Sequence, residues 1–266
     1  MPPGPTHLIL LPSYNSGTRL TAVVREVLPL GWPTLVVIDG STDDSEREVL
    51  AMAGFHENLS VICRPTNQGK GAAVLEGARV ALERGFTHAL VMDSDGQHPA
   101  GSITTFMEVS MRNPEALIVG EPIFPDNIPR ERLHGRKLSN GLVWMELLGR
   151  GINDVLFGFR VYPLTPLLAA LKDRSGGRRY DFETEAAVRL AWAGIMPVNV
   201  RAPVRYLSRE EGGISHFHYV RDNARLVIMH VKLLAELLLF RWPALLRHRR
   251  AWKGHPAWPR LHREGP

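Results

Sequence analysis

Short apolar runs alternate with helical patterns over the first 120 residues of the chain. The apolar runs are four or five residues long and occupy positions 7–11, 34–38, 59–63, 88–92 and 116–120. The segments between most of them repeat apolar residues every three or four positions, as one face of a helix requires, at 17–28, 41–52, 71–84 and 99–111. Strands this short between such helices indicate βαβ units, so we predict an α/β fold with a mostly parallel sheet.

The pattern is less regular after residue 120. Residues 121–130 contain three prolines and predict a loop, whereas 152–162 and 195–206 predict irregular or extended chain. Helical spacing returns at 132–148, 182–193 and, as a long apolar segment, 219–240. We expect residues 1–216 to form one α/β domain and residues 217–266 to form an apolar or amphipathic helix followed by a basic tail.

The long apolar helix is nearly long enough to cross a bilayer, which takes about 20 apolar residues. It contains too many charged or titratable residues for a comfortable span: Arg221, Asp222, Arg225, His230, Lys232 and Glu236. An apolar end at 233–239, followed by Trp242 and several arginines, is typical of a helix at a membrane surface. The alternative is a helix that packs on the domain and continues into a polar tail.

The net charge of +5 is concentrated at the C-terminus. Residues 241–266 carry seven Lys or Arg and one Glu, while residues 1–240 carry 25 basic and 26 acidic residues. This excess suits an anionic surface such as membrane lipid, and a solvated tail is the alternative. We expect no nucleic-acid partner.

Two further features bear on location. The lone cysteine, Cys63, rules out an internal disulfide and is expected to be a small buried hydrophobe. Residues 1–12 show no basic segment before an apolar stretch, so no secretory signal is expected. We predict a cytoplasmic protein, peripheral at the cytoplasmic face of the membrane.

Two acidic turns follow the apolar runs at 34–38 and 88–92. The first is Asp39-Gly40-Ser41-Thr42-Asp43-Asp44, where Ser41 or Thr42 is expected to cap the next helix, and the second is Asp93-Ser94-Asp95-Gly96-Gln97-His98. Carboxylates at positions i and i+2 of an extended chain point the same way and can face one divalent cation. Because ligands in parallel sheets lie beyond the carboxyl ends of the strands, we predict a nucleotide site with a metal there.

Four segments resemble family 2 glycosyltransferases with the GT-A fold, in order and in spacing. They are Pro12-Ser13-Tyr14-Asn15, Asp39-Gly40-Ser41-Thr42-Asp43, Asn67-Gln68-Gly69-Lys70-Gly71-Ala72 and Asp93-Ser94-Asp95-Gly96-Gln97-His98. The chain is most similar to the branch of polyprenyl- and dolichyl-phosphate sugar synthases, specifically over 6–120 and less so over 150–216. The resemblance implies a Rossmann-like GT-A sheet with flanking helices and an inverting transfer of sugar from a nucleoside-diphosphate sugar.

The resemblance also implies the donor and metal residues. Asp93, Asp95 and Gln97 would hold Mg²⁺ or Mn²⁺, which neutralises charge on the leaving diphosphate. The nucleotide would contact Pro12, Tyr14, Asn15, Asp39, Lys70 and Ser94. Ile38 replaces the first of two adjacent aspartates common in the family, so Asp39 is either a base contact or a turn residue. His98 is expected in an exposed loop, and a further polar neighbour of the metal is the alternative.

On the acceptor side the resemblance points to Glu183 as a base, completing a catalytic set with Asp93 and Asp95. Glu185 lies about 200° away on a helix, so only one of the two would enter the site. A hydroxyl acceptor needs a base, whereas a phosphate acceptor is already anionic; a plain surface carboxylate is the alternative. Further acceptor or phosphate contacts are expected from Asp154, Arg160, Arg205, Arg209, Ser215 and His216. Arg160 could instead pair with a carboxylate. His216 stands where a lysine is common in the family.

The leading hypothesis is therefore a metal-dependent glycosyltransferase acting on a lipid or lipid-linked acceptor. A polyprenyl-phosphate sugar synthase, with a phosphate acceptor, is the alternative. An Asp-x-Asp-Gly turn also occurs in haloacid-dehalogenase-like phosphoryl-transfer enzymes, but there it usually follows the first strand, and here it follows the fourth predicted strand. A catalytically silent sugar-nucleotide binder is the remaining alternative.

Overall fold

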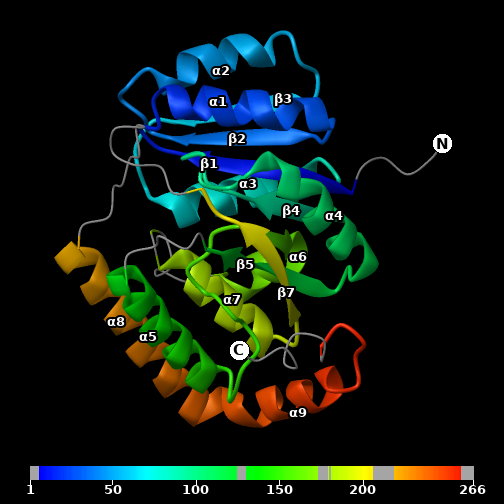
Figure 1. Ribbon diagram of the computed structural model, residues 1–266, viewed down its shortest axis with the longest axis vertical. Helices are drawn as coiled ribbons and strands as arrows, with labels where there is room; N and C mark the ends of the chain where they lie inside the picture. The colour runs from blue at the N-terminus through cyan, green and yellow to red at the C-terminus, as the bar shows by residue number, and fades with distance from the viewer. Residues whose placement is uncertain (1–5, 125–129, 173–178, 180, 206–218, 259–266) are drawn as a thin grey trace.

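The strands form one twisted sheet with helices around it (Figure 1). The computed structural model describes residues 6–124, 130–172, 179, 181–205 and 219–258. Its strands are β1 His7–Ser13, β2 Thr34–Asp39, β3 Leu59–Arg64, β4 His88–Val91, β5 Ala116–Ile123, β6 Arg160–Pro163 and β7 Met196–Pro203. Their order is β3-β2-β1-β4-β6-β5-β7, and β6 alone among them runs antiparallel to its neighbours. The predicted α/β fold with a mostly parallel sheet is confirmed.

Helices connect and cover these strands. They are α1 Thr18–Val27, α2 Ser45–Ala53, α3 Lys70–Glu83, α4 Ile103–Arg112, α5 Arg130–Glu146, α6 Leu164–Ala170, α7 Phe182–Trp192, α8 Tyr219–Glu236 and α9 Trp242–Trp252. Every residue of β1, β2 and β4 is buried, as the uninterrupted apolar runs predict for strands covered on both faces. Helix α3 lies close to the sheet because Gly77 has no side chain; a Cβ there would come 2.4 Å from Leu10 Cδ1.

The start of α2 differs from the expected one. The helix begins at Ser45, after Asp44 in a left-handed conformation (φ 55°), and not at Ser41 or Thr42. Instead of capping a helix, the Ser41 hydroxyl accepts a hydrogen bond from the Asn15 main-chain N–H at 3.0 Å. The Thr42 N–H donates to Asn15 Oδ1 at 2.7 Å. Contacts with a distant loop therefore replace the local capping bond.

The prediction that Cys63 is buried is also wrong. Its strand, β3, lies at the edge of the sheet and pairs on one side only, with β2. The Cys63 side chain is exposed there.

The C-terminal segment is more ordered than a tail. The long helix ends at Glu236, continues through a π-helical turn at Leu237–Arg241, and is followed by α9. Leu245 and Trp252 are buried seven residues apart on one side of α9, so the segment predicted as a polar tail folds back as a packed helix. Helix α8 contacts α5, and α9 contacts α7. The proposed boundary at 216 lies outside the described residues.

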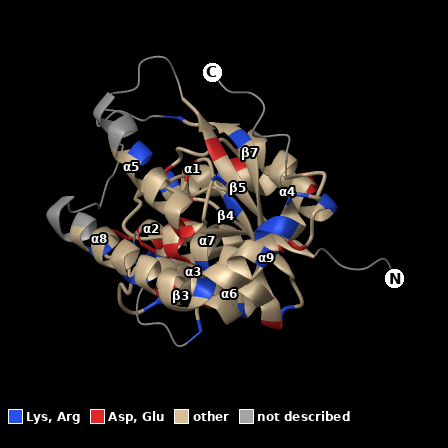
Figure 2. Ribbon diagram, turned by 90° about the horizontal axis from the view of Figure 1, so that it is seen from below, with Lys and Arg blue, Asp and Glu red and all other residues tan. Residues whose placement is uncertain are grey.

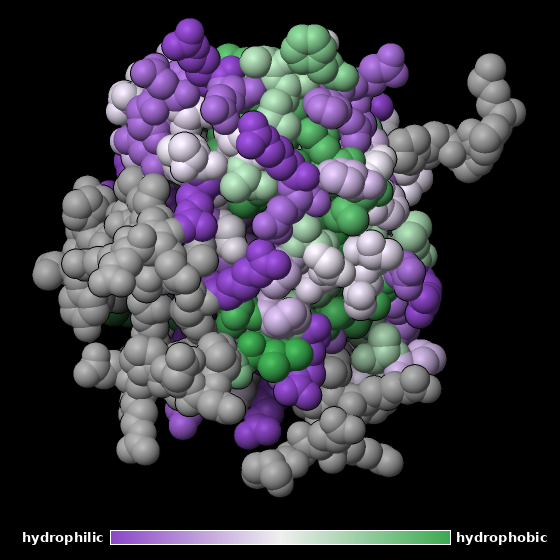
Figure 3. All heavy atoms as spheres, turned by 45° about the horizontal axis from the view of Figure 1, so that its top comes forward, coloured by the Kyte–Doolittle hydropathy of each residue, from purple (hydrophilic) through white to green (hydrophobic). Residues whose placement is uncertain are grey.

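Figures 2 and 3 show the polar and charged residues at the two ends of the molecule. The end that carries α2 is mostly hydrophilic or neutral in Figure 3. At the opposite end, α8 and α9 lie in the foreground when the molecule is seen from below, with basic residues along them (Figure 2). No helix in the described ranges has both the length and the apolar character needed to cross a membrane.

A stacked pair of histidines lies at the amino ends of β1 and β4. His7 and His88 are register partners whose ring centroids are 4.5 Å apart with nearly parallel planes. Burial, and then the neighbouring His88, lower the pKa of His7 from 6.5 to about 4. Burial also lowers the pKa of His88, against the Pro114 carbonyl that accepts from its ring. Both rings are therefore neutral in the folded protein near pH 7.

This pair predicts that the protein loses stability in mild acid. Because the pKa of His7 is lower in the folded than in the unfolded state, its contribution is complete above pH 6.5 and is lost as the pH falls toward 4. The free energy of unfolding from urea titrations is expected to fall by on the order of 2–3 kcal/mol over this range. In His7→Gln the slope between pH 6.5 and 4 should become shallower, and an unchanged slope would contradict the assignment.

Candidate active site

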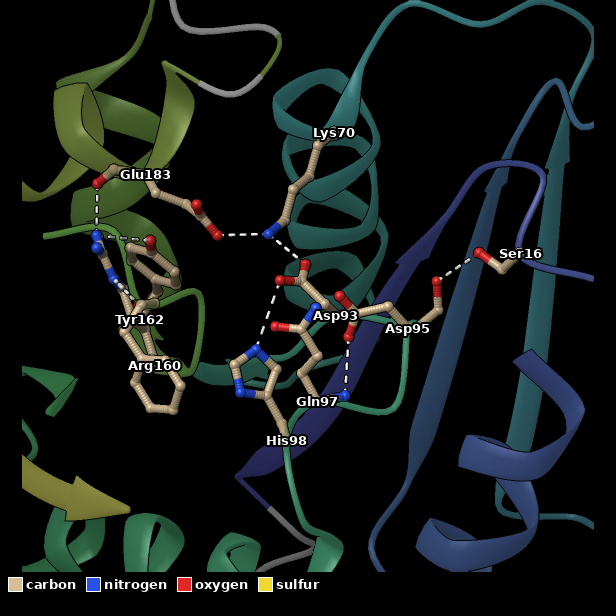
Figure 4. A network of polar contacts seen from close by, with 11 residues as sticks. Ser16, Lys70, Asp93, Asp95, Gln97, His98, Arg160, Tyr162 and Glu183 are labelled. Atoms are coloured by element: carbon tan, nitrogen blue, oxygen red, sulfur yellow. Dashed lines mark hydrogen bonds and ion pairs between the residues drawn. The ribbon is translucent and has the colours of Figure 1, made fainter. Parts of the chain in front are cut away.

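The loops that follow β1, β2 and β4 are joined by side-chain hydrogen bonds at the carboxyl edge of the sheet. Ser16 Oγ lies 2.8 Å from Ser94 Oγ, which links the first loop to the second acidic turn (Figure 4). The Gly17 N–H donates to Asp43 Oδ2 at 2.8 Å, which links the first loop to the first acidic turn. Asn15 adopts a left-handed conformation (φ 46°) between these contacts. The two acidic turns therefore meet at one edge, as expected from their positions after strands.

Asp39 organises the glycine-rich turn that precedes α3. Its buried carboxylate accepts hydrogen bonds from Arg64 Nη1 at 2.7 Å and from the Gly69 N–H at 2.6 Å, with the Gln68 N–H at 3.1 Å. Gly40 has φ +66°, and a Cβ there would come 2.5 Å from the Asn67 nitrogen. These contacts correspond to the interpretation of Asp39 as a turn residue, and the turn fixes the start of the helix that bears Lys70.

Lys70 joins three distant segments at the centre of the site. Its ammonium Nζ, at the start of α3, pairs with Asp93 beyond β4 and with Glu183 Oε1, 2.5 Å away in the first turn of α7 (Figure 4). Burial opposes the charge of Lys70, but the two carboxylates outweigh it and raise the pKa of the ammonium above its usual range. Burial likewise opposes ionisation of Asp93, yet Lys70 and His98 hold the pKa of that carboxyl well below its usual range.

The negative charge of Asp95 is balanced less well by neighbouring positive charge than that of Asp93. Burial, and then the charge of Asp93, raise the pKa of Asp95, although its Oδ1 accepts the Gln97 N–H at 2.9 Å. Two carboxylates therefore share a half-buried loop with one ammonium, an arrangement that a further cation would stabilise. Carboxylate oxygens and the Gln97 amide oxygen are the hard donors that Mg²⁺ and Mn²⁺ prefer. In the described ranges no three His, Cys, Asp or Glu side chains form a ready-made metal cluster, so other ligands, such as oxygens of a substrate, would have to complete the set.

Comparison with known proteins decides the family. The profile described as Glycosyl transferase family 2 matches residues 8–166, more than half of the chain. The chain belongs to family 2 of the glycosyltransferases. The expected family is thus confirmed, and the phosphoryl-transfer alternative is wrong.

The relatives of this glycosyltransferase agree with the expected branch. It is 28% identical to the undecaprenyl-phosphate mannosyltransferase of Micrococcus luteus, with 77% of this chain and 85% of that protein covered. It is 29% identical to the polyprenol monophosphomannose synthase of Mycolicibacterium smegmatis (77% and 78%) and 26% identical to the glycosyltransferase AglJ of Haloferax volcanii (84% and 70%).

Solved structures confirm the GT-A fold. Glucosyl-3-phosphoglycerate synthase from Mycobacterium tuberculosis, solved with Mn²⁺, UDP-glucose and phosphoglyceric acid, matches with a TM-score of 0.58 at 19% identity, covering 88% of this chain and 79% of that one. The mannosyltransferase PcManGT of Pyrobaculum calidifontis, solved with GDP-mannose and Mn²⁺, matches with a TM-score of 0.58 at 16% identity (94% and 74%).

His98 of this glycosyltransferase is buried, in contrast to the exposed position that the sequence predicts. It was expected in an exposed loop, but it is 5% exposed and stacks on Phe159 with ring centroids 5.3 Å apart. Its Nε2 lies 3.5 Å from Asp93 Oδ2, while Nδ1 has no hydrogen-bond partner among the described residues. The aromatic residues that bury it lie about 60 positions later in the sequence, so no local pattern could have indicated its burial.

Gly158 is a second residue whose importance emerges only in three dimensions. A Cβ at this position would lie 2.6 Å from Glu183 Oε1 and 2.8 Å from Asp93 Oδ2. The main chain of Gly158 therefore forms one wall of the Lys70 cluster, and a side chain there would displace the carboxylates of Glu183 and Asp93.

Arg160 does not face the site. It is fully buried and donates to three main-chain carbonyls, those of Val155 at 2.5 Å, Glu183 at 2.5 Å and Phe157 at 3.2 Å. The expectation that it meets a phosphate or pairs with a carboxylate is wrong, because these carbonyls take up its donors. Arg160 instead ties the loop before β6 to the first turn of α7.

The remaining predicted residues are spread around this centre. Pro12 is buried in β1 and Tyr14 is half-buried just beyond it, while the buried Ser94 is engaged with Ser16. Asp154 accepts from Arg136 Nη1 at 2.6 Å, and Glu185 pairs with Arg189 at 2.7 Å, away from Lys70. The Arg205 N–H donates to the Gln97 carbonyl at 2.9 Å, and its exposed side chain lies beside Glu26. Arg209, Ser215 and His216 lie outside the described residues.

Proposed function

We propose that the protein is a metal-dependent, inverting glycosyltransferase that moves a sugar from a nucleoside diphosphate onto a polyprenyl phosphate. The observation that carries the proposal is the pairing of Glu183 with Lys70 beside Asp93. A carboxylate that accepts from a buried ammonium is poorly suited to remove a proton from a hydroxyl. A phosphate oxygen is already anionic and needs no base. The names of the relatives from Micrococcus and Mycolicibacterium, which specify polyprenol phosphates, support the same acceptor class.

The proposed roles follow from the positions of the side chains. Asp93, Asp95 and Gln97 would hold Mg²⁺ or Mn²⁺, which when bound supplies positive charge to the leaving diphosphate. Lys70 keeps the carboxylates of Asp93 and Glu183 in place, and His98 packs behind Asp93. Inversion corresponds to one in-line step: the acceptor oxygen forms the bond to the anomeric carbon while the bond to the diphosphate breaks.

Parallel assays with matched acceptors test this proposal. Thermal shifts with UDP-, GDP- and dTDP-sugars and Mn²⁺ identify the donor, since a ligand bound only by the folded state raises its stability. Transfer from that donor is then measured to a polyprenyl phosphate and to the corresponding free alcohol. We expect product from the phosphate only, with the anomeric configuration inverted by NMR. Transfer to the alcohol at an equal rate would overturn the phosphate acceptor.

Glu183→Gln distinguishes the two acceptor classes by kinetics. The glutamine keeps the size of the side chain and an oxygen that can accept from Lys70. With a phosphate acceptor, kcat should fall by less than about tenfold, because no proton is transferred to this residue. With a hydroxyl acceptor, loss of the base would lower kcat by about 10²–10⁴-fold. Glu185→Gln, the same change two positions along α7 in a side chain turned toward Arg189, is the matched control.

A further inference from the structure

The outer side of α8 and α9 is apolar although it is exposed. Half of the large hydrophobic residues that are exposed in the described part of the chain lie here. This outer face consists of Val227, Ile228, Val231, Leu238, Leu239, Phe240, Trp242 and Leu246. Leu238, Leu239 and Phe240, in the π-helical turn, are each about 70% exposed. Apolar surface gathered in this way marks an interaction site more often than chance exposure.

The opposite side of α8 is already packed against the domain. Met229, Leu233 and Leu237 are buried at the spacing of one helical face. His230 Nδ1 lies 2.7 Å from Glu146 of α5, and Glu236 accepts from Arg189 of α7 at 2.9 Å. The helix is thus apolar on two sides, and only one of them is covered by the protein core.

The charges around the outer face are nearly all positive. Residues 224–258 contain seven Lys or Arg and one acidic residue, Glu236. Glu236 is neutralised within the protein, because it also accepts from Arg241 at 2.8 Å. The exposed basic residues are Lys232, Arg241, Arg247, Arg250 and Lys253 (Figure 2). An apolar face bordered by basic side chains is complementary to an anionic lipid surface.

We propose that the outer face of α8 and α9 docks on an anionic lipid bilayer, parallel to its plane. The apolar residues enter the acyl boundary while the basic residues contact lipid phosphates. Trp242, about half exposed between the two helices, suits the headgroup level because its ring is apolar with one polar N–H. That the enzyme meets its acceptor at this bilayer rests on the proposed function. Binding of the outer face to lipid can be measured without donor or acceptor.

Vesicle sedimentation with the full chain tests the apolar contribution. We expect binding to vesicles of phosphatidylcholine and phosphatidylglycerol, and weaker binding to phosphatidylcholine alone. The triple variant Leu238→Gln, Leu239→Gln, Phe240→Gln should bind the anionic vesicles at least tenfold more weakly. Phe55→Gln, which removes an 88%-exposed aromatic ring near α2 at the other end of the molecule, should bind like the unchanged chain (Figure 1). Equal binding of the triple variant would overturn the proposal.

A second pair of variants tests the charges. Arg247→Glu with Arg250→Glu should abolish the preference for anionic vesicles, whereas Arg47→Glu with Arg84→Glu, the same charge change on exposed residues of α2 and the end of α3, should not. All substituted side chains are exposed, so an unchanged melting temperature confirms folding. If light scattering showed a dimer that the triple variant converts to monomer, with no vesicle binding by either, the occupant would be a second copy and the proposal would be wrong.

Two outcomes distinguish a failure of the docking surface from a failure of the proposed function. Vesicle binding without transfer to polyprenyl phosphate would overturn the function and leave the docking surface standing. Transfer to detergent-dispersed polyprenyl phosphate without vesicle binding would overturn the docking surface alone.

Discussion

Asp93→Asn is expected to lower sugar transfer by about 10³-fold or more while the protein stays folded. The substitution keeps the size of the side chain but removes the charge that faces Lys70 and His98. It also removes one of the two carboxylates proposed to hold the metal, and charge stabilisation of a leaving group is commonly worth several kcal/mol. Since each 1.4 kcal/mol corresponds to a factor of ten in rate, a loss of this size is the expected scale.

Two measurements check the Asp93 prediction. The transfer rate should fall, and the rise in melting temperature that Mn²⁺ and nucleotide together produce should disappear. Asp44→Asn is a suitable control, because Asp44 is exposed at the same edge of the sheet and its left-handed conformation (φ 55°) is one that asparagine adopts readily. Normal turnover by Asp93→Asn would refute the site assignment.

Gly158→Ala is expected to reduce kcat/KM by at least about 10²-fold with little loss of stability. The added methyl group would lie within 3.0 Å of both Glu183 Oε1 and Asp93 Oδ2, closer than real Cβ contacts. The ends of these side chains can move, so the fold should survive. They line the site, however, and misplacing groups that position the reactants by about 1 Å can cost 10²-fold in rate.

Gly151→Ala provides the matched control for Gly158. It lies in the same connection between α5 and β6, and its Cβ would meet the nearest atom, of Trp258, at an ordinary 3.5 Å. We expect Gly151→Ala to retain activity. If Gly158→Ala had full activity with a normal melting temperature, the wall that Gly158 forms would not matter for the reaction.

The sequence was sufficient for the first five strands of the sheet because its information there is local. β1, β2 and β4 each appear as a continuous apolar run, and the acidic turns follow β2 and β4 directly, so both turns could be placed at the carboxyl edge. The family resemblance added Asp93, Asp95 and Gln97 as expected metal ligands and Lys70 as an expected nucleotide contact.

The rest depends on contacts between distant segments. Lys70 and Glu183 are 113 positions apart, and nothing near either residue predicts that they pair. Whether Arg160 would face a ligand or the core could not be read from its neighbours, because its acceptors are carbonyls that the folded chain brings around it. The same holds for Ser41 and Thr42, which form hydrogen bonds with Asn15 of another loop instead of capping the next helix.

The reversed direction of β6 has a consequence for how this enzyme can diversify. Because β6 is antiparallel to β4, with Arg160 opposite Val91, the chain before β6 enters the site from the edge where the chain after β4 leaves it. Residues 12–98 thus supply one side of the Lys70 cluster, and the described residues between 154 and 185 supply the other. Two contiguous stretches of sequence meet without interleaving, so we expect sugar-nucleotide preference and acceptor preference to be inherited separately, and a recombinant that exchanges only the second stretch to keep its donor.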